Sequence, residues 1–153
     1  MNSKNLQPNQ DLVISIVVPK TPKEAFEAIK DVKAWWVGDV KGDAKQTGSK
    51  FTYRYKEFHY SSQVVTEMEM NKKIVWHVDD AAIGFTEDKN EWTGTDLIFE
   101  IFPRAEKTEI KFTHRGLTPK LECFEACSAG WEFYITKSLK NFLLEGQGLD
   151  PGI

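Results

Sequence analysis

The chain has 153 residues, the length of one ordinary domain with a sizeable hydrophobic core. Its 20 basic and 23 acidic residues give a formal net charge of −3 with both signs interspersed, which argues against nucleic acid or an anionic membrane surface as a partner. No run of about 18 apolar residues predicts a membrane span, and two cysteines are too few for a disulfide scaffold.

The amino-terminal part of the sequence predicts a tail, a strand and two short helices. Residues 1–10 are expected to form a disordered tail without the apolar stretch of a secretory signal, so the expected location is cytoplasmic. Residues 12–18, LVISIVV, are rich in β-branched side chains and predict a strand. Thr21 and Glu24 have the spacing of a capping box at a helix start, and Asp31 is expected to cap a second short helix.

From residue 38 onward, apolar and polar residues alternate, which is typical of antiparallel strands with one solvated face. Residues 80–91 are expected to form a polar loop that interrupts this pattern. The side chains expected on the inner face of the sheet are Phe51, Tyr53, Tyr55, Val64, Thr66, Met68, Met70, Ile74, Trp76, Val78, Thr95, Leu97, Phe99, Ile101, Ile110, Phe112 and His114.

The last predicted element is a long amphipathic helix that ends near Gly146. At about 25 residues and about 1.5 Å per residue, it would be nearly 40 Å long. Its predicted apolar stripe contains Leu121, Phe124, Cys127, Ser128, Trp131, Ile135, Ser138, Leu139 and Phe142. Only this helix is large enough to cover the apolar face of the sheet. We therefore predict an α+β fold in which a curved antiparallel sheet of about six to seven strands surrounds the carboxy-terminal helix.

Five segments carry a resemblance to a known family: PKEAFEAIKDVKAWW, KKIVWHV, EWTGTDLIFEI, FTHRGL and CSAGWEFYITKSLKNFLLEGQG. The chain resembles START-like, or SRPBCC, domains of the helix-grip type, and more narrowly the branch named after the activator of heat-shock protein 90 ATPase. The resemblance covers residues 11–149, which we expect to form a single domain. It implies a cavity between helix and sheet that holds hydrophobic ligands. Relatives in this superfamily include cyclases, lipid-binding proteins and co-chaperones.

Inward-facing aromatic residues with a few polar groups among them are typical of a small-molecule pocket. The expected ligand-binding residues are Trp36, Tyr53, Tyr55, Val64, Thr66, Trp76, Phe99, Phe112, His114, Cys127, Ser128 and Trp131. Two interpretations remain open for the indole of Trp131, which either packs in the core or offers its N–H to a ligand. His114 either satisfies a neighbouring carbonyl or hydroxyl group, or contacts the ligand.

The cysteines do not have the spacing of a metal site. Cys123 and Cys127 lie four residues apart on the predicted helix, and a metal would need two further ligands. His59, His77 and His114 are expected on separate strands or a turn, so we expect no metal, no cofactor and no internal disulfide. Cys127 is expected to act as a small apolar residue beneath the sheet, since only His114 could serve it as a base.

The leading hypothesis is a protein that binds a small hydrophobic or amphipathic ligand in the cavity, with no catalytic residue of its own. One alternative is a cyclase- or hydrolase-like enzyme that uses His114 with Tyr53 or Tyr55. Another is a co-chaperone-like regulator of the heat-shock protein 90 ATPase. Phe133 and Leu144 point away from the predicted stripe, so they are either singly exposed residues or a homodimer contact.

Overall fold

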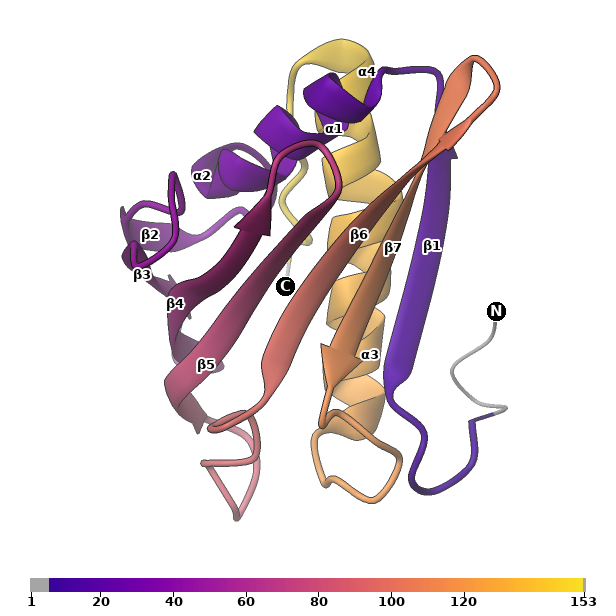
Figure 1. Cartoon of the computed structure of the whole chain (residues 1–153). Helices are drawn as coiled ribbons and strands as arrows, with labels where there is room; N and C mark the ends of the chain where they lie inside the picture. Colours follow the sequence, from indigo (N-terminus) through magenta and orange to yellow (C-terminus); the bar gives the residue numbers. More distant parts are fainter. Residues whose placement is uncertain (1–5, 153) are drawn as a thin grey trace.

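An antiparallel sheet curls around one long helix in the computed structural model, which describes residues 6–152 (Figure 1). The seven strands are β1 (Leu12–Val18), β2 (Asp39–Gly42), β3 (Lys50–Tyr55), β4 (His59–Glu69), β5 (Lys73–Ile83), β6 (Asp96–Arg104) and β7 (Lys107–Arg115). Their order across the sheet is β1-β7-β6-β5-β4-β3-β2. The predicted helix-grip architecture is therefore confirmed, with β1 and β2 as the two edges of the sheet.

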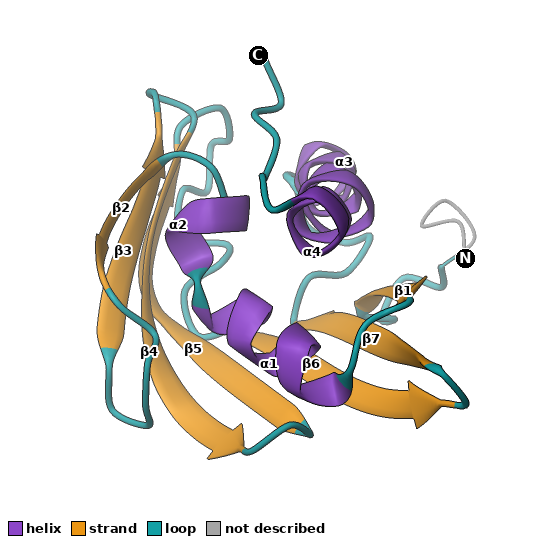
Figure 2. Cartoon of the chain, turned by 90° about the horizontal axis from the view of Figure 1, so that it is seen from above, coloured by secondary structure: helices purple, strands orange, loops and turns teal. Residues whose placement is uncertain are grey.

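All helices lie on the concave side of the sheet, as the view from above shows (Figure 2). Two short helices, α1 (Pro22–Lys30) and α2 (Val32–Trp35), follow β1. The carboxy-terminal helix consists of three consecutive segments, α3 (Phe124–Phe133), η2 (Tyr134–Leu139) and α4 (Lys140–Glu145). The hydrophobic core is a single cluster between this helix layer and the sheet.

The start of α1 has the predicted capping box. The backbone N–H of Glu24 donates to Thr21 Oγ1 at 3.1 Å, and the backbone N–H of Thr21 donates to Glu24 Oε1 at 3.0 Å. The prediction for Asp31 is only half right. Asp31 occupies the N-cap position of α2, but its side chain makes no capping hydrogen bond.

The predicted phase of β4 is wrong at Val64 and Thr66, and Met70 beyond its end is exposed. The side chains that point inward are Ser61, Gln63 and Val65, whereas Thr66 is exposed. The register between β4 and β5 shifts between Val65 and Glu67, so Thr66 is the extra residue of a β-bulge. Because a bulge reverses the alternation of side chains, extrapolating from Met68 back toward Val64 selects the wrong face.

Strand β5 reaches further than predicted and takes up the first residues of the expected polar loop. Ala81 and Ile83 are buried on its inner face. The remaining loop carries two large aromatic residues, Phe85 and Trp92, that have no periodic pattern around them. Trp92 is buried, while Phe85 is 48% exposed.

The carboxy-terminal helix contains a π-helical segment that periodicity does not predict. Segment η2 has wider turns than an α-helix, with hydrogen bonds from residue i to i+5. It buries Tyr134 beside the predicted Ile135, Ser138 and Leu139. The helix ends at Gly146, whose φ of 80° is the left-handed conformation that favours glycine.

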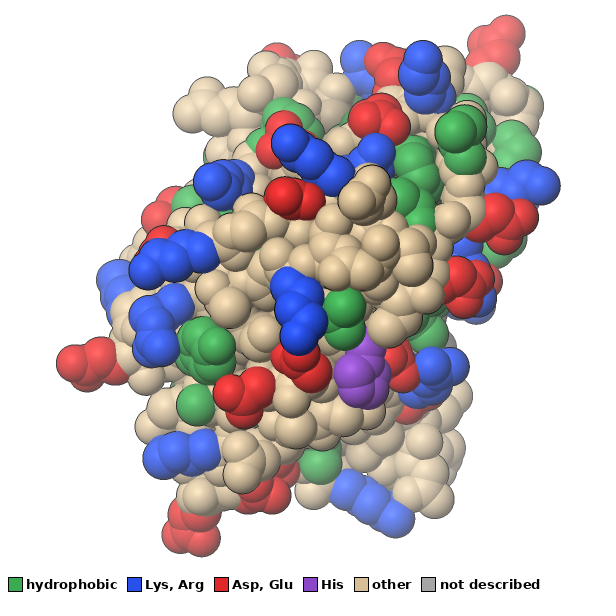
Figure 3. Space-filling model, turned by 60° about the vertical axis from the view of Figure 1, so that its left-hand side comes forward, with side chains coloured by type: hydrophobic (Ala, Val, Ile, Leu, Met, Phe, Trp, Pro, Cys, Tyr) green, Lys and Arg blue, Asp and Glu red, His purple; other side chains and the backbone are tan. Residues whose placement is uncertain are grey.

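Residues 1–5 of the expected tail lie outside the described residues. Leu6 packs against the core, and the backbone N–H of Gln10 donates to the carbonyl of Gln7. Basic and acidic side chains are interspersed on the face shown in Figure 3. Within residues 6–152, no helix is long and apolar enough to cross a bilayer.

Candidate ligand-binding cavity

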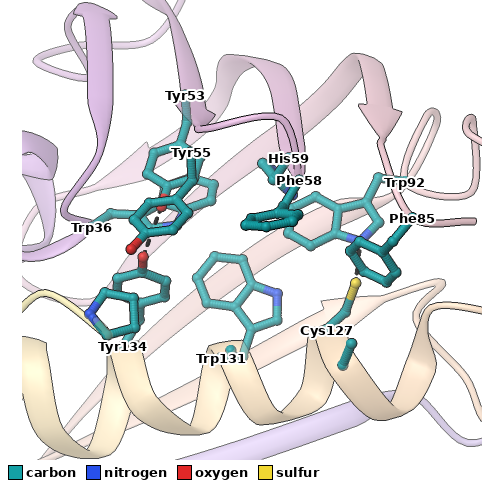
Figure 4. Close-up of a pocket in the computed structure, with 13 residues that line it drawn as sticks. Trp36, Tyr53, Tyr55, Phe58, His59, Phe85, Trp92, Cys127, Trp131 and Tyr134 are labelled. Atoms are coloured by element: carbon teal, nitrogen blue, oxygen red, sulfur yellow. Dashed lines mark hydrogen bonds between the residues drawn. The ribbon is translucent and has the colours of Figure 1, made fainter. Parts of the chain in front are cut away.

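A cavity of about 400 Å³ lies between the concave face of the sheet and the carboxy-terminal helix (Figure 4). Its volume falls within the range of small-molecule sites. The residues that line it are Trp36, Tyr53, Tyr55, Phe58, His59, Phe85, Trp92, Ala126, Cys127, Gly130, Trp131, Tyr134 and Pro151. Most of these side chains are aromatic, so the cavity offers large flat apolar surfaces.

Five of the residues expected at the site line this cavity: Trp36, Tyr53, Tyr55, Cys127 and Trp131. The others lie elsewhere in the fold. Trp76, Phe99 and Phe112 are fully buried in the core beneath it. Ser128 and His114 are also buried and do not line the cavity. Val64 and Thr66 lie away from the cavity, because the bulge at Thr66 sets the phase of β4.

Eight lining residues were not predicted. Half of them come from loops, and the others are His59 on β4 and Ala126, Gly130 and Tyr134 on the carboxy-terminal helix. Phe58 lies in the β3–β4 turn, Phe85 and Trp92 lie in the β5–β6 loop, and Pro151 lies beyond the last helix. Loop residues carry no hydrophobic period, so periodicity could not find them. Gly130 could have been predicted from the sequence, because the small residues before Trp131 leave space beside the indole.

The walls are built by rings that contact one another. Trp36 stacks on Tyr53 with ring centroids 4.2 Å apart, and the Trp36 and Trp131 centroids are 4.9 Å apart. Trp92 stacks against Trp131 at 5.7 Å. Trp36 is held by its neighbour Trp35, whose indole N–H donates to the carbonyl of Ile29. Mutual packing fixes these rings, so the flat walls are preorganised for a ligand.

A pair of tyrosine hydroxyl groups forms the polar end of the cavity. The Tyr53 and Tyr134 oxygens are 2.8 Å apart, and both lie near the Val37 carbonyl, at 3.0 and 3.1 Å. The two hydroxyl groups have only two protons, so they cannot donate in all three of these contacts at the same time. If one hydroxyl donates to Val37 and accepts from the other, both protons are used and only lone pairs face the cavity. Burial raises the pKa of Tyr134 to about 12 and that of Tyr53 further, so both hydroxyls stay neutral near pH 7.

His114 is held on both sides by hydrogen bonds. The Trp131 indole N–H donates to His114 Nδ1 at 3.0 Å, and His114 Nε2 lies 2.9 Å from Thr95 Oγ1. Thr95 Oγ1 in turn donates to the Trp92 carbonyl at 2.6 Å. This chain is satisfied when Nε2 carries the proton of a neutral ring. Burial lowers the pKa of His114 to about 3, so the ring is neutral near pH 7.

This network decides both questions that the sequence left open. His114 satisfies a neighbouring hydroxyl, and the Trp131 N–H is occupied by His114 and is not available to a ligand. Among the described residues, the indole N–H of Trp36 has no hydrogen-bond partner, and Trp36 lines the cavity. Trp36, and not Trp131, is therefore the lining tryptophan whose N–H is left without a partner in the described part of the chain.

A second polar group lies where β4 begins. His59 Nε2 is 2.9 Å from Ser61 Oγ, which also accepts from the Gln63 amide. Burial lowers the pKa of His59 to about 3. Nδ1 of His59 has no partner among residues 6–152, so the ring can offer a donor or an acceptor depending on its tautomer. The Gln63 Oε1 atom is buried and has no partner among the described residues.

Both cysteines are free and buried. The Trp92 indole N–H donates to Cys127 Sγ at 3.3 Å. Cys123 starts α3, and its backbone N–H donates to Glu91 Oε1 at 2.9 Å. Within the described part of the chain, no group of three or more His, Cys, Asp or Glu side chains could hold a metal ion.

Comparisons with known proteins agree with this architecture. Residues 19–143 match the family model described as "Activator of Hsp90 ATPase homolog 1-like protein". The solution structure of the Aha1 dimer from Colwellia psychrerythraea is 24% identical with a TM-score of 0.73, over 91% of this chain and 99% of that one. Protein MLL2253 from Mesorhizobium loti is 14% identical with a TM-score of 0.72, over 92% and 100%.

Protein SSP2350 from Staphylococcus saprophyticus is 16% identical with a TM-score of 0.68, over 92% of this chain and 96% of that one. At these identities, the likeness to solved structures establishes the fold alone. No curated protein matches the chain.

Proposed function

Because the chain belongs to the family of Activator of Hsp90 ATPase homolog 1-like proteins, whose fold commonly encloses a ligand cavity, we propose that it binds a small hydrophobic or amphipathic molecule. The ligand occupies the cavity between the sheet and the carboxy-terminal helix and is not chemically changed by the protein. Activity has to be argued from the site and not from the fold.

The observation that carries this proposal is the aromatic lining of the cavity. Trp36, Trp92 and Trp131 supply flat apolar walls, and these rings are already ordered by one another. The polar atoms are few, which favours an amphipathic ligand with one or two hydrogen-bonding groups. The neutral Tyr53 and Tyr134 hydroxyls accept a donor from the ligand, and the Trp36 indole N–H donates to an acceptor.

Two variants of Gly130 test whether the ligand occupies this cavity. An added Cβ at Gly130 would meet open space, and Gly130 lines the cavity. Gly130→Phe is expected to fill the cavity and abolish binding, whereas Gly130→Ala should retain most of the affinity. Alanine and phenylalanine both have a higher helix propensity than glycine, alanine by about 1 kcal/mol. Neither substitution should therefore destabilise the helix.

The measurement is native mass spectrometry of protein purified from its own host, followed by thermal shift with the extracted compound. A ligand present at about 100 times its Kd stabilises the folded state by about 2.7 kcal/mol. Equal retention of the compound by Gly130→Phe and by the unmodified protein would refute the proposed location. Conversion of the compound during incubation would refute a purely binding function.

The enzymatic alternative receives no support from His114. Both ring nitrogens of this residue are engaged, with Trp131 and Thr95, and the ring does not line the cavity. A general base has to reach the proton that it removes. His59 does line the cavity and has one nitrogen without a partner, so it is the residue to replace if turnover is ever detected.

Regulation of a chaperone is the second candidate function, and the family match over residues 19–143 favours it. The test is the ATPase rate of the heat-shock protein 90 of the same host with and without this protein. Stimulation that survives Gly130→Phe would assign the effect to the protein surface and not to the cavity.

We also propose a homodimer, since one structural neighbour is described as a dimer. Leu144 is 40% exposed on α4, and Phe133 is half-buried on α3. Sedimentation of the unmodified protein and of Leu144→Asp tests this contact. A dimer that persists unchanged in Leu144→Asp would place the interface elsewhere.

A further inference from the structure

One nucleophilic side chain belongs to the cavity wall and has no part in the proposed function. Cys127 is a free cysteine on α3 that lines the cavity and is 8% exposed. Figure 4 shows its sulfur pointing from the helix toward Trp92, near the ring of Phe85. Phe58 and Phe85 are 45% and 48% exposed and also line the cavity, so they mark its open side. A ligand in the cavity can therefore reach the sulfur.

One hydrogen-bond donor reaches this sulfur atom. The Trp92 indole N–H donates to Cys127 Sγ at 3.3 Å. A second buried thiol, Cys123, lies one helical turn earlier. A hydrogen bond to the charged form of a group favours that form. The neighbouring Cys123 thiol and the Trp92 N–H both lower the pKa of the Cys127 thiol, Cys123 being the larger cause.

The surroundings also contain groups that oppose ionisation. Burial of Cys127 and the carboxylate of Glu91 both raise its pKa. The Glu91 carboxylate is held at the start of the helix by the backbone N–H groups of Glu122 and Cys123. The rings of His59 and His114 pack against Trp92 and are neutral near pH 7. The neighbouring Cys123 thiol and the Trp92 N–H outweigh these effects, so the pKa of the Cys127 thiol falls overall.

We propose that Cys127 is a covalent attachment site for aromatic ligands that carry a conjugated, electrophilic carbon–carbon double bond. An aryl enone or a quinone is the class of ligand that fits the aromatic walls and the position of the sulfur. This inference rests on the proposed function, because the ligand reaches the sulfur through the same cavity.

The reaction consumes only the protein and the ligand. The Cys127 sulfur forms a bond to the β-carbon of the double bond while the π bond breaks. The electron pair moves to the α-carbon, stabilised by the adjacent carbonyl. The proton released from the thiol returns there through solvent, so the product is a thioether and no oxidant or reductant is required. The neighbouring Cys123 is not itself consumed.

Three small imides test the proposal. N-phenylmaleimide has both the ring and the electrophilic double bond, N-ethylmaleimide lacks the ring, and N-phenylsuccinimide lacks the double bond. Intact-mass measurement and peptide mapping should find one adduct, on Cys127. The preference for N-phenylmaleimide over N-ethylmaleimide should exceed the preference of free glutathione by about tenfold, because burial of the phenyl ring favours the bound state.

Matched variants separate the cause from a general thiol reaction. Cys127→Ser should remove the adduct. Trp92→Phe removes the donor to the sulfur and should slow the reaction about tenfold at pH 7, which corresponds to a rise of about one unit in the thiol pKa. Cys123→Ala removes the neighbouring thiol and should slow the reaction in the same direction. Melting curves of these variants check that the fold is retained. An adduct that forms first on Cys123, or a ring preference equal to that of glutathione, would overturn the proposal.

The same compounds distinguish failure of this inference from failure of the proposed function. A thermal shift with N-phenylsuccinimide, together with no adduct from N-phenylmaleimide in the folded protein, would refute the covalent site and leave the binding cavity intact. Adduct formation that Gly130→Phe does not slow would refute the route through the cavity.

Discussion

At the scale of single residues, His114 has a structural role, because it holds a ring that lines the cavity. His114 fixes the Trp131 ring through one nitrogen and Thr95 through the other. Sequence reasoning correctly placed His114 on the inner face of the sheet, because it continues the alternation of Ile110 and Phe112. It could not decide the partners of the ring, since Thr95 lies in the loop before β6 and Trp131 lies on the helix.

The neutral state of His114 predicts how stability depends on pH. Its pKa is about 3 in the folded protein and 6.5 in an ordinary environment, so the unfolded chain binds the proton first as the pH falls. The contribution of His114 is complete above pH 6.5 and is lost between pH 6.5 and about 3, by about 1.4 kcal/mol per pH unit. Denaturant unfolding across this window should therefore be less pH-dependent in His114→Gln.

The comparison with His114→Gln is informative because other titrating groups are common to both proteins. His59, whose pKa is also lowered to about 3 by burial, contributes in the same direction and remains in the variant. Identical pH dependence of the unfolding free energy in the two proteins would mean that His114 is not buried as a neutral ring.

Two buried serines on the carboxy-terminal helix should respond oppositely to replacement by alanine. Ser128 Oγ has no partner among the described residues, whereas Ser138 Oγ donates to the Trp35 carbonyl and accepts from the backbone N–H of Leu149. Ser128→Ala is expected to raise the unfolding free energy by about 1 kcal/mol. Ser138→Ala should lower it by about 1–3 kcal/mol, because it leaves two groups unpaired.

These two values can be read from urea melts. The pair also tests the expected role of Ser128 in ligand binding, since a hydroxyl that contacts the ligand would lose affinity on replacement. Unchanged affinity in Ser128→Ala would assign this residue to the core. A destabilised Ser128→Ala would show that its hydroxyl has a partner after all.

At the scale of secondary-structure elements, what can be predicted depends on whether the local signal is complete within a few residues. The start of α1 needs only Thr21, Glu24 and the proline between them, and the structure has the predicted capping box. The inner faces of β3, β6 and β7 follow strict alternation and are also as predicted.

A strand with a bulge and a helix with a π-helical segment could not be predicted from a constant hydrophobic period, because each contains an extra residue. The bulge at Thr66 reverses the phase of β4, and the π-helical segment adds Tyr134 to the buried face of the last helix. Both irregularities bring polar or aromatic groups to the inner side of the fold: Gln63 on β4, and Tyr134 beside Tyr53. Irregular segments of this kind often accompany functional sites.

The capping box provides a prediction for the first helix. Thr21→Ala removes the side-chain acceptor of the Glu24 N–H and should lower the unfolding free energy by about 1 kcal/mol. Thr47→Ala is the matched control, because Thr47 is exposed in a turn; it should change the free energy by less than about 0.5 kcal/mol. Equal midpoints for both variants in denaturant melts would contradict the contribution of the cap.

At the scale of the whole molecule, the cavity is assembled from two kinds of segment. The rings of Tyr53 and Trp131 lie on a regular strand and a regular helix, where periodicity identifies them. Phe58, Phe85 and Pro151 come from a turn, a loop and the carboxy-terminal segment, whose positions depend on tertiary contacts. Sequence reasoning therefore predicts the floor of the cavity better than its opening.

The carboxy-terminal segment closes one side of this opening. After Gly146 the chain turns back toward α2, and Gly148 lies so close to the Ala34 carbonyl that a Cβ atom would be only 2.0 Å from it. The Asp150 carboxylate accepts from the Tyr55 hydroxyl at 3.1 Å, and the next residue, Pro151, lines the cavity. The hydrogen bond between Tyr55 and Asp150 thus holds Pro151 against the cavity.

Removal of this bond should change the rates of ligand exchange more than the affinity. Asp150→Ala removes the bond to Tyr55 and a second one within the segment, from the backbone N–H of Gly152 to Asp150 Oδ1. The bond to Tyr55 is worth about 0.5–1.5 kcal/mol, so its loss should let the segment open about 2- to 13-fold more often. If the ligand passes Pro151, its association and dissociation rates rise by the same factor and the Kd stays nearly constant. Stopped-flow measurement of tryptophan fluorescence reports both rates, since Trp36, Trp92 and Trp131 line the cavity.

Tyr55→Phe removes the same hydrogen bond from the other side and serves as the matched variant. If the bond is the cause, combining Tyr55→Phe with Asp150→Ala should accelerate exchange no more than Asp150→Ala alone, as a double-mutant cycle requires for two partners of one interaction. Rates that remain unchanged in all three variants would show that the ligand does not pass the carboxy-terminal segment. It would then enter between the exposed rings of Phe58 and Phe85.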